Sequence, residues 1–446
     1  MGSVIHTKSG CVAGVDMSGY TVYRGIPYAQ APVGELRWRR PRPVMKWDGI
    51  YSADTFRSMC PQELPDPETP WGAGYYREFY SDAAFIPPMS EDCLYLNIWV
   101  PESAGEGSAL PVAFYIHGGG FAGGYGSEKE FDGEAFCRKG VILVTINYRT
   151  GIFGFFAHPW LDGENEQGIS GNYGTLDQIA ALAWVYENIA AFGGDPGNIT
   201  VFGQSAGSMS TQVLVSSPLA KGMIAKAVLQ SGISCRESIL YTPDLKEEEQ
   251  IGEDFVRITG AQSPEQLREM SWEQLQDHKK ELDGLCMRRL HDPLVLVPNV
   301  DGFVLEKSVR EVWECGEMAP IPYMAGLTLD DLGNTPEKAV RGEFGPLLDE
   351  CRRWSLTCAR AFGKPACLYR FSHALPGDEW GSRAFHSSEL WYVFGTLGRS
   401  WRPMEQADFD LSEEMVTAWT NFMKTGKPAG GWRPYTEEDP FIRDFR

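Results

Sequence analysis

A serine stands between two glycines at the end of a β-rich run in Asn198-Ile199-Thr200-Val201-Phe202-Gly203-Gln204-Ser205-Ala206-Gly207. The run 198–202 predicts a strand, and the residues after Gly207 are compatible with a helix. Glycines on both sides permit a sharp strand-to-helix turn that exposes the Ser205 hydroxyl, and the following helix N-terminus favours negative charge beside it. The pattern predicts a nucleophilic serine, although a tight turn with an incidental serine would read the same.

A glycine-rich loop, His117-Gly118-Gly119-Gly120, follows the β-rich run 112–116. Such a loop can bring backbone N–H groups close to a reacting carbonyl and form an oxyanion hole. Three glycines alone could mark a merely flexible loop. Their occurrence ahead of the serine turn, in the order that a hydrolase of this kind requires, favours the catalytic interpretation.

The general base should be a histidine that follows the nucleophile in the chain. The candidates are His278, His291, His373 and His386. The first two lie in a highly charged stretch, and His373 follows a predicted strand. Because His386 lies in a loop that enters an aromatic segment, these observations favour it over His373 without excluding His373.

Strand-like runs and helical patterns alternate along the chain. Further β-rich runs are found at 94–100, 141–146, 225–229, 323–326 and 367–371, and the apolar spacing over 176–189 predicts a helix. This alternation predicts an α/β protein whose mostly parallel central sheet has helices on both faces.

The distribution of charged and apolar residues along the sequence predicts one large core that an insertion divides into two parts. Residues 1–235 are expected to form the N-terminal part of the core, and residues 321–446 its C-terminal part. Between them, 236–320 is rich in charged, amphipathic segments and predicts a helical cap insertion. A short lid segment is expected at 333–364 within the C-terminal part.

The composition excludes several classes of protein. Asp and Glu outnumber Lys and Arg by 60 to 40, a formal net charge of -20, so nucleic acid and anionic membranes are not expected as partners. No signal peptide and no apolar run near the ~20 residues of a membrane span are visible, which predicts a cytoplasmic protein. The cysteines lack metal-site spacing, so no metal site is expected. Oligomeric state is not readable from the sequence.

Several motifs together resemble the type-B carboxylesterases, the family of cholinesterases and para-nitrobenzyl esterases. They are Glu91-Asp92-Cys93-Leu94-Tyr95-Leu96-Asn97, Phe192-Gly193-Gly194-Asp195-Pro196 and the two glycine motifs above. The likeness extends from Tyr23 to Gly426 and so covers nearly the whole chain. It implies an α/β-hydrolase fold with helical cap insertions and a serine hydrolase that cleaves small-molecule carboxylic esters without a cofactor.

The resemblance also implies roles for individual residues. Ser205 would be the nucleophile and His386 its base. The other implied positions are the oxyanion-hole N–H groups of Gly119, Gly120 and Ala206, the positions beside the acid and base at Ser231 and Glu389, and the buried ion pairs Arg24 with Glu91 and Arg149 with Asp177.

The triad acid departs from the commonest family pattern, which has Glu five residues after a glycine that ends a strand. In Gly326-Leu327-Thr328-Leu329-Asp330-Asp331 that place belongs to Asp331. Aspartate can hold the imidazole in the correct tautomer equally well. Asp330 is the rival, and Leu332 replaces a glycine that the family often has next.

A loop of aromatic residues is expected beside the site. Cys60 and Cys93 match two cysteines that secreted relatives join into a loop, and the sequence leaves open whether they form a disulfide. The loop contains Trp71, Tyr75 and Tyr76, which are expected to line the substrate pocket, although such aromatics also serve as loop packing. With the short lid, they predict short-chain acyl esters of bulky or aromatic alcohols.

Other functions remain open at this point. An amidase, a lactonase or a feruloyl-type esterase would use the same residues, because pocket walls choose the substrate. A catalytically silent cholinesterase-like binding module is disfavoured, because such a module lacks the nucleophile or the base and this chain has both.

Overall fold

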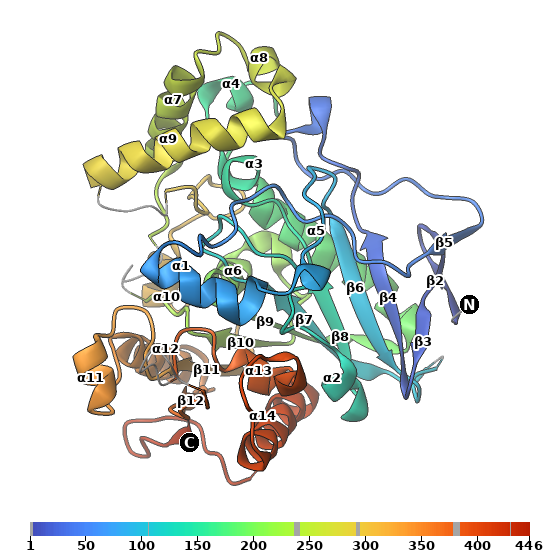
Figure 1. Ribbon diagram of the computed structural model, residues 1–446, viewed down its shortest axis with the longest axis vertical. Coiled ribbons are helices and arrows are strands. Elements are labelled where there is room, and N and C mark those ends of the chain that lie inside the picture. The colour runs from blue at the N-terminus through green and yellow to red at the C-terminus, as the bar shows by residue number, and fades with distance from the viewer. Residues whose placement is uncertain (1–2, 106, 236–240, 291–294, 378–383, 429) are drawn as a thin grey trace.

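The computed structural model describes residues 3–105, 107–235, 241–290, 295–377, 384–428 and 430–446. Its centre is a large sheet, and a small sheet lies near the N-terminus (Figure 1). In the described ranges the large sheet contains, in spatial order, β13 (Ile442–Phe445), β12 (Cys367–Phe371), β11 (Tyr323–Thr328), β10 (Lys226–Gln230), β9 (Gly194–Gln204), β7 (Leu110–Ile116), β8 (Ile142–Ile146), β6 (Tyr95–Pro101), β4 (Tyr20–Pro27) and β3 (Val15–Met17). The small sheet is formed by β1 (Val4–Thr7), β2 (Gly10–Ala13) and β5 (Ile50–Ser52).

The sheet is parallel over most of its width. From β8 through β7, β9, β10, β11 and β12 to β13 all pairings are parallel, whereas β3, β4, β6 and β8 pair antiparallel. Every residue of β8, β10 and β11 is buried, because both sheet faces are covered. Such strands read as continuous apolar runs, which is why they are visible in the sequence. The predicted mostly parallel sheet is confirmed.

Helices cover both faces of this sheet. Side chains of β7 alternate between two cores: Val112, Phe114 and Ile116 belong to one, and Ala113 and Tyr115 to the other. Helices α5, α6 and α12 pack into the first core, and α2, α13 and α14 into the second. The described helices are α1 (Pro70–Tyr75), α2 (Glu134–Arg138), α3 (Gly151–Phe155), α4 (Pro159–Asp162), α5 (Tyr173–Asn188), α6 (Ala206–Ser216), α7 (Leu245–Thr259), α8 (Pro264–Glu269), α9 (Trp272–Leu290), α10 (Val309–Cys315), α11 (Pro336–Val340), α12 (Leu347–Phe362), α13 (Leu390–Val393) and α14 (Gln406–Thr425).

The expected cap, 236–320, contains α7, α8, α9 and α10, of which the first three group at one end of the molecule (Figure 1). Ser271 and Gln274 cap the start of α9 reciprocally, with N–H to side-chain oxygen distances of 2.9 and 3.3 Å. Residues 236–240 and 291–294 lie outside the described residues. In the expected lid, 333–364, α12 packs on β11 and β12. The division into core, cap and lid stays a prediction.

Of the two expected ion pairs, one forms. Arg149 and Asp177 are buried, with 2.7 Å between Nε and Oδ2. The expected pair of Arg24 with Glu91 is wrong, because Arg37 takes the Glu91 carboxylate, with 2.6 Å between Nε and Oε2. Arg24, a residue of β4, instead lies over the Phe56 ring at 5.1 Å and donates to the Asp54 carbonyl at 3.3 Å.

Cys60 and Cys93, whose bonding the sequence left open, are buried free thiols. A hydrogen bond with Cys60 and burial raise the pKa of the Cys93 thiol, so this group stays protonated. The two cysteines flank the segment that carries α1, and both side chains belong to the first core.

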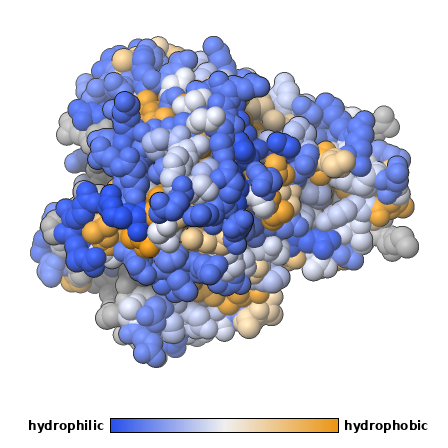
Figure 2. Space-filling view, turned by 90° about the horizontal axis from the view of Figure 1, so that it is seen from above, coloured by the Kyte–Doolittle hydropathy of each residue, from blue (hydrophilic) through white to orange (hydrophobic). Residues whose placement is uncertain are grey.

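Hydrophilic residues cover most of the face shown in Figure 2, with smaller hydrophobic patches between them. The chain carries 60 Asp and Glu against 40 Lys and Arg, a formal net charge of -20. Among the described residues, no helix combines the length and the apolar character needed to cross a membrane. The cytoplasmic location stays a prediction.

Candidate active site

The order of the strands brings two loops together. After β7 the chain forms β8 on one side of it and later β9 on the other, and the carboxyl ends of parallel strands at such a switch point border a crevice. Ile116 pairs with Gly203, so the loop 117–120 and Ser205 leave the sheet side by side. A Cβ built on Gly118 would lie 3.2 Å from the Ser205 Cβ.

Ser205 occupies a strained turn between β9 and α6. Its φ of 56° and ψ of -127° are a conformation that L-residues rarely adopt. Close backbone approach explains the flanking glycines: a Cβ on Gly203 would lie 2.4 Å from the Gly207 carbonyl, and one on Gly207 would lie 2.0 Å from the Ile116 oxygen. The Ser205 N–H donates to the Gln230 carbonyl at 2.9 Å, which ties the turn to β10.

Three backbone donors surround this turn. The N–H groups of Gly119, Gly120 and Ala206 have no protein acceptor among the residues that the structure describes. Gly119 and Gly120 have φ values of 103° and 62°, a region that favours glycine. The loop is closed behind them, because the Gly119 carbonyl accepts from Ala122 at 3.0 Å. These donors are the ones expected to form an oxyanion hole.

His117 holds the glycine loop in place. Its ring stacks on Tyr148 with 4.3 Å between centroids, and its Nδ1 lies 2.9 Å from the Gly118 carbonyl. Burial lowers the pKa of His117 to about 4, so the imidazole is neutral and its Nδ1–H donates to that carbonyl. Gln62 supports the far end of the loop by donating to the Gly124 carbonyl at 3.1 Å.

His386 meets Asp331, with 2.6 Å between Nδ1 and Oδ1. The Asp331 carboxylate also accepts the N–H groups of Thr328 and Leu332, both at 2.8 Å. The rival Asp330 instead uses its backbone, donating to the Ala384 carbonyl at 2.8 Å in the segment that carries the histidine.

The other candidate histidines lie elsewhere. His373 binds Asp408, with 2.7 Å between Nε2 and Oδ1. His278 belongs to α9, where its nearest acid is Glu281 at 4.0 Å. His291 lies outside the described residues. The structure therefore joins one of these candidates, His386, to the expected acid.

The electrostatics favour an ionised acid beside a basic imidazole. Burial alone would raise the pKa of Asp331, but His386, the nearby Ser231 hydroxyl and the Thr328 N–H together lower it. Burial alone would lower the pKa of His386, but Asp331 and then Glu389 raise it overall. Burial, reinforced by the charge of Asp331, raises the pKa of Glu389 to about 7.

Glu389, which sequence similarity places beside the acid and base, is joined to β10 through an amide. The Gln230 Nε2 lies 3.4 Å from the Glu389 Oε1, and the Gln230 Oε1 accepts from the Trp419 indole at 3.2 Å. The amide side chains of Gln62, Gln204 and Gln230 were not predicted as site residues. The sequence signal that could have identified them is their proximity to residues already singled out: Gln204 precedes Ser205, Gln230 precedes Ser231, and Gln62 lies two residues after Cys60.

The expected pocket aromatics have different environments. The Tyr75 hydroxyl lies 2.5 Å from the Ser387 hydroxyl, next to His386 in the chain, and its ring packs on Phe79 at 5.0 Å. Tyr76 is half-buried against the second core. Trp71 belongs to α1, but its side chain lies outside the described residues. Their contact with substrate stays a prediction.

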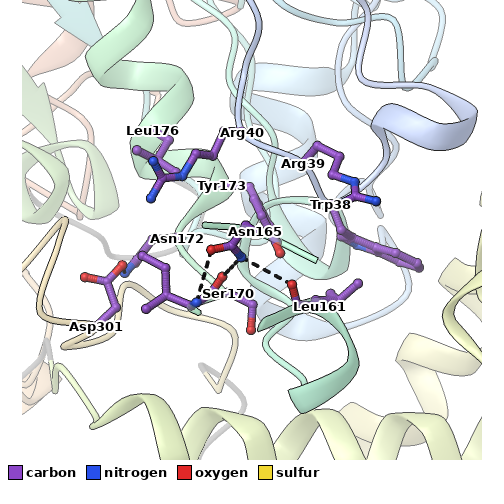
Figure 3. A pocket seen from close by; sticks show the side chains of 11 residues that line it. Trp38, Arg39, Arg40, Leu161, Asn165, Ser170, Asn172, Tyr173, Leu176 and Asp301 are labelled. Atoms are coloured by element: carbon purple, nitrogen blue, oxygen red, sulfur yellow. Dashed lines mark hydrogen bonds between the residues drawn. The ribbon is translucent and has the colours of Figure 1, made fainter. Parts of the chain in front are cut away.

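A separate pocket opens at the start of α5, and Figure 3 shows Trp38, Arg40, Tyr173 and Asp301 among its lining side chains. None of the expected site residues lines it. Within the described residues, no three His, Cys, Asp or Glu side chains gather as a metal site requires. The expected absence of metal and cofactor from the reaction stays a prediction.

Comparison with known proteins places this arrangement in a family. The chain matches the Carboxylesterase family over residues 2–344 and 346–444. It is 34% identical to the fumonisin B1 esterase of Sphingopyxis macrogoltabida, over 97% of this chain and 84% of that protein. It is 33% identical to the para-nitrobenzyl esterase of Bacillus subtilis (strain 168), over 98% of this chain and 93% of that protein.

Solved structures agree with the sequence comparison. A thermophilic PNB esterase superposes with a TM-score of 0.84 at 30% identity, covering 100% of this chain and 96% of the other. A PNB esterase superposes with a TM-score of 0.83 at 29% identity and the same coverage. The expected α/β-hydrolase fold is confirmed, and the chain belongs to the type-B carboxylesterase family, as an enzyme that hydrolyses small-molecule carboxylic esters.

Proposed function

We propose that the chain cleaves esters through an acyl-enzyme formed on Ser205, with His386 as general base and Asp331 as the acid that orients it. The observation that carries the proposal is the 2.6 Å contact of His386 Nδ1 with Asp331, in the same site as a serine at φ 56°. A neutral imidazole with its proton on Nδ1 leaves Nε2 free to accept a proton from Ser205.

In the first step the Ser205 Oγ attacks the ester carbonyl while His386 Nε2 takes the hydroxyl proton. The imidazolium is stabilised by the buried Asp331 carboxylate. The carbonyl oxygen becomes an oxyanion, and the N–H groups of Gly119, Gly120 and Ala206 are the donors available to it.

Collapse of the tetrahedral intermediate breaks the bond to the alcohol oxygen, which receives the proton from His386. A water molecule then attacks the acyl-enzyme and gives its proton to the same Nε2. The second collapse frees the carboxylic acid and returns the proton to Ser205. Atoms and charge balance, with no cofactor in either step.

For the substrate we propose short-chain acyl esters of bulky or aromatic alcohols. Support comes from the aromatic segment, because Tyr75 lies beside the His386 loop. The name of the para-nitrobenzyl esterase relative also indicates an ester of an aromatic alcohol as that protein's substrate. The formal net charge of -20 supports the absence of nucleic-acid and membrane partners.

The test is Ser205→Ala with para-nitrophenyl acetate as substrate. Loss of a triad member typically costs on the order of a million-fold in kcat, and His386→Ala should behave alike. The matched control is His373→Ala, whose imidazole binds Asp408 away from the site and which should keep near-wild-type turnover. Substantial kcat in purified, folded Ser205→Ala protein would refute the proposal.

A further inference from the structure

The turn that carries His386 has a strained backbone. The Ser388 N–H donates to the Phe385 carbonyl at 3.0 Å and closes a turn of four residues, in which His386 is the second and Ser387 the third. Ser387 has a φ of 78°. Where the third residue of a turn has a positive φ, glycine is favoured, because a side chain there is crowded. A serine in this conformation persists only when its surroundings hold it there.

The Ser387 side chain is held by a tyrosine from a distant segment. Ser387 is only 2% exposed, and its hydroxyl lies 2.5 Å from the Tyr75 hydroxyl. Burial raises the pKa of Tyr75, so the bond joins two neutral hydroxyls. A buried hydroxyl that loses its partner is costly. The contact with Tyr75 therefore offsets the strain of the turn.

The segment that presents Tyr75 is anchored to the element that follows the histidine. Tyr75 ends α1, and the π-helical turn η2 (Tyr76–Tyr80) follows it directly. In η2 the buried Glu78 carboxylate accepts the Trp391 indole N–H at 2.9 Å. Trp391 belongs to α13, which begins four residues after His386. The position of Tyr75 is thus fixed relative to the turn that it contacts.

A second attachment holds the entry to the turn. The Asp330 N–H donates to the Ala384 carbonyl at 2.8 Å, and an isolated β-bridge pairs Asp330 with Phe385. This attachment ties the turn to the residue before Asp331. The bond to Tyr75 is the corresponding attachment after His386. Together they fix the backbone of the histidine, and the backbone limits the directions in which its imidazole can point.

We propose that Tyr75 and Ser387 are a pair of positioning residues: the bond between their hydroxyls holds the His386 turn in its strained conformation and so aims the imidazole at Ser205. The proposal rests on the proposed role of His386 as the base. It assigns neither hydroxyl a contact with the reacting atoms.

The test compares Ser387→Ala with Ser387→Gly. Alanine keeps the strain of the positive φ but lacks the hydroxyl, so the turn should leave its native conformation for part of the time. For para-nitrophenyl acetate, kcat should fall at least about fivefold, the size of one lost hydrogen bond, with little change in KM. Glycine also lacks the hydroxyl but adopts a positive φ without strain, so Ser387→Gly should recover most of the loss. If the hydroxyl acted on the substrate directly, both variants would lose the same activity.

Tyr75→Phe removes the other half of the bond and should lower kcat by a similar factor. Adding Ser387→Ala to Tyr75→Phe should cause no further loss, because both changes remove the same bond. Adding Ser387→Gly instead should restore most of kcat. The matched control is Tyr323→Phe, which removes a buried hydroxyl that donates to the Ala319 carbonyl at 2.7 Å, at the start of β11. It should lower Tm and leave kcat unchanged.

Two results would overturn the proposal. One is wild-type kcat in folded Tyr75→Phe or folded Ser387→Ala protein, and the other is a loss in Ser387→Ala that Ser387→Gly does not recover. Circular dichroism checks folding, and the two Ser387 variants decide alone if the Tyr75→Phe protein is unfolded. Turnover that survives Ser205→Ala in the same assay would instead contradict the proposed mechanism itself.

Discussion

Replacing Asp331 by asparagine should remove nearly all turnover while preserving the fold. The carboxylate has a donor at each oxygen: the Thr328 N–H at Oδ2, and the His386 Nδ1–H and the Leu332 N–H at Oδ1. An asparagine amide offers one accepting oxygen and one donating nitrogen. If the nitrogen faces His386, the imidazole must carry its proton on Nε2 and cannot accept the Ser205 proton.

The opposite orientation of the amide is also unfavourable. The amide nitrogen would then face the Thr328 N–H, and a buried backbone donor would lose its acceptor. In either orientation the imidazolium loses the charge that stabilises it. If the worked serine-protease case transfers, kcat falls about ten-thousand-fold. This corresponds to ~5 kcal/mol of lost transition-state stabilisation.

The adjacent residue supplies the control. Asp330 is half-buried and makes its contact with the histidine segment through its backbone. Burial and the charge of Asp331 raise the pKa of Asp330, so Asp330→Asn relieves repulsion and should keep kcat within a few-fold of the wild type. The assay is para-nitrophenyl acetate hydrolysis at neutral pH, with folding checked by circular dichroism. A large loss at Asp330 with near-normal turnover of Asp331→Asn would refute the assignment.

Two further predictions follow from the same site. Because the pKa of Glu389 is raised from 4.5 to about 7, its contribution to stability is present below pH 4.5 and is lost as pH rises through 7. From pH 5 to pH 8 the free energy of unfolding should therefore fall less for Glu389→Gln than for the wild type, by at most about 3 kcal/mol, and thermal melts should show this as a smaller drop in Tm; equal drops would contradict the prediction. With para-nitrophenyl esters, kcat/KM should be greatest for short acyl chains; a steady rise from acetate to palmitate would contradict the proposed substrate class.

The sequence was informative where burial constrains both faces of an element. Fully buried runs such as β8 and β11 could be read directly, because no solvent-facing alternation interrupts them. Strands β3 and β13 were not predicted: they are short, edge-lying and partly exposed, so their patterns resemble loops. The helix predicted over 176–189 is α5, displaced by a few residues at its start.

The contacts of individual side chains were harder to predict. Residue type alone could not separate Asp331 from Asp330. The five-residue spacing after Gly326 favoured Asp331, and in the structure the Asp331 side chain is the one that contacts His386. The arginine partner of Glu91 was predicted wrongly. Arg24 and Arg37 both precede Glu91 in the chain, and only the tertiary structure brings Arg37 within hydrogen-bond distance of it. The contact of Gln204 with His386 is likewise invisible in a linear motif, since the two residues come from distant segments.

The central claim is that Ser205 forms the covalent intermediate. A fluorophosphonate probe reacts with a serine that an adjacent base activates, and mass spectrometry of peptides then locates the adduct. We predict one equivalent of adduct on the peptide that contains Ser205, with none on the Ser205→Ala protein and strongly slowed labelling of His386→Ala. An adduct on another residue, or equal labelling of the Ser205→Ala protein, would contradict the mechanism.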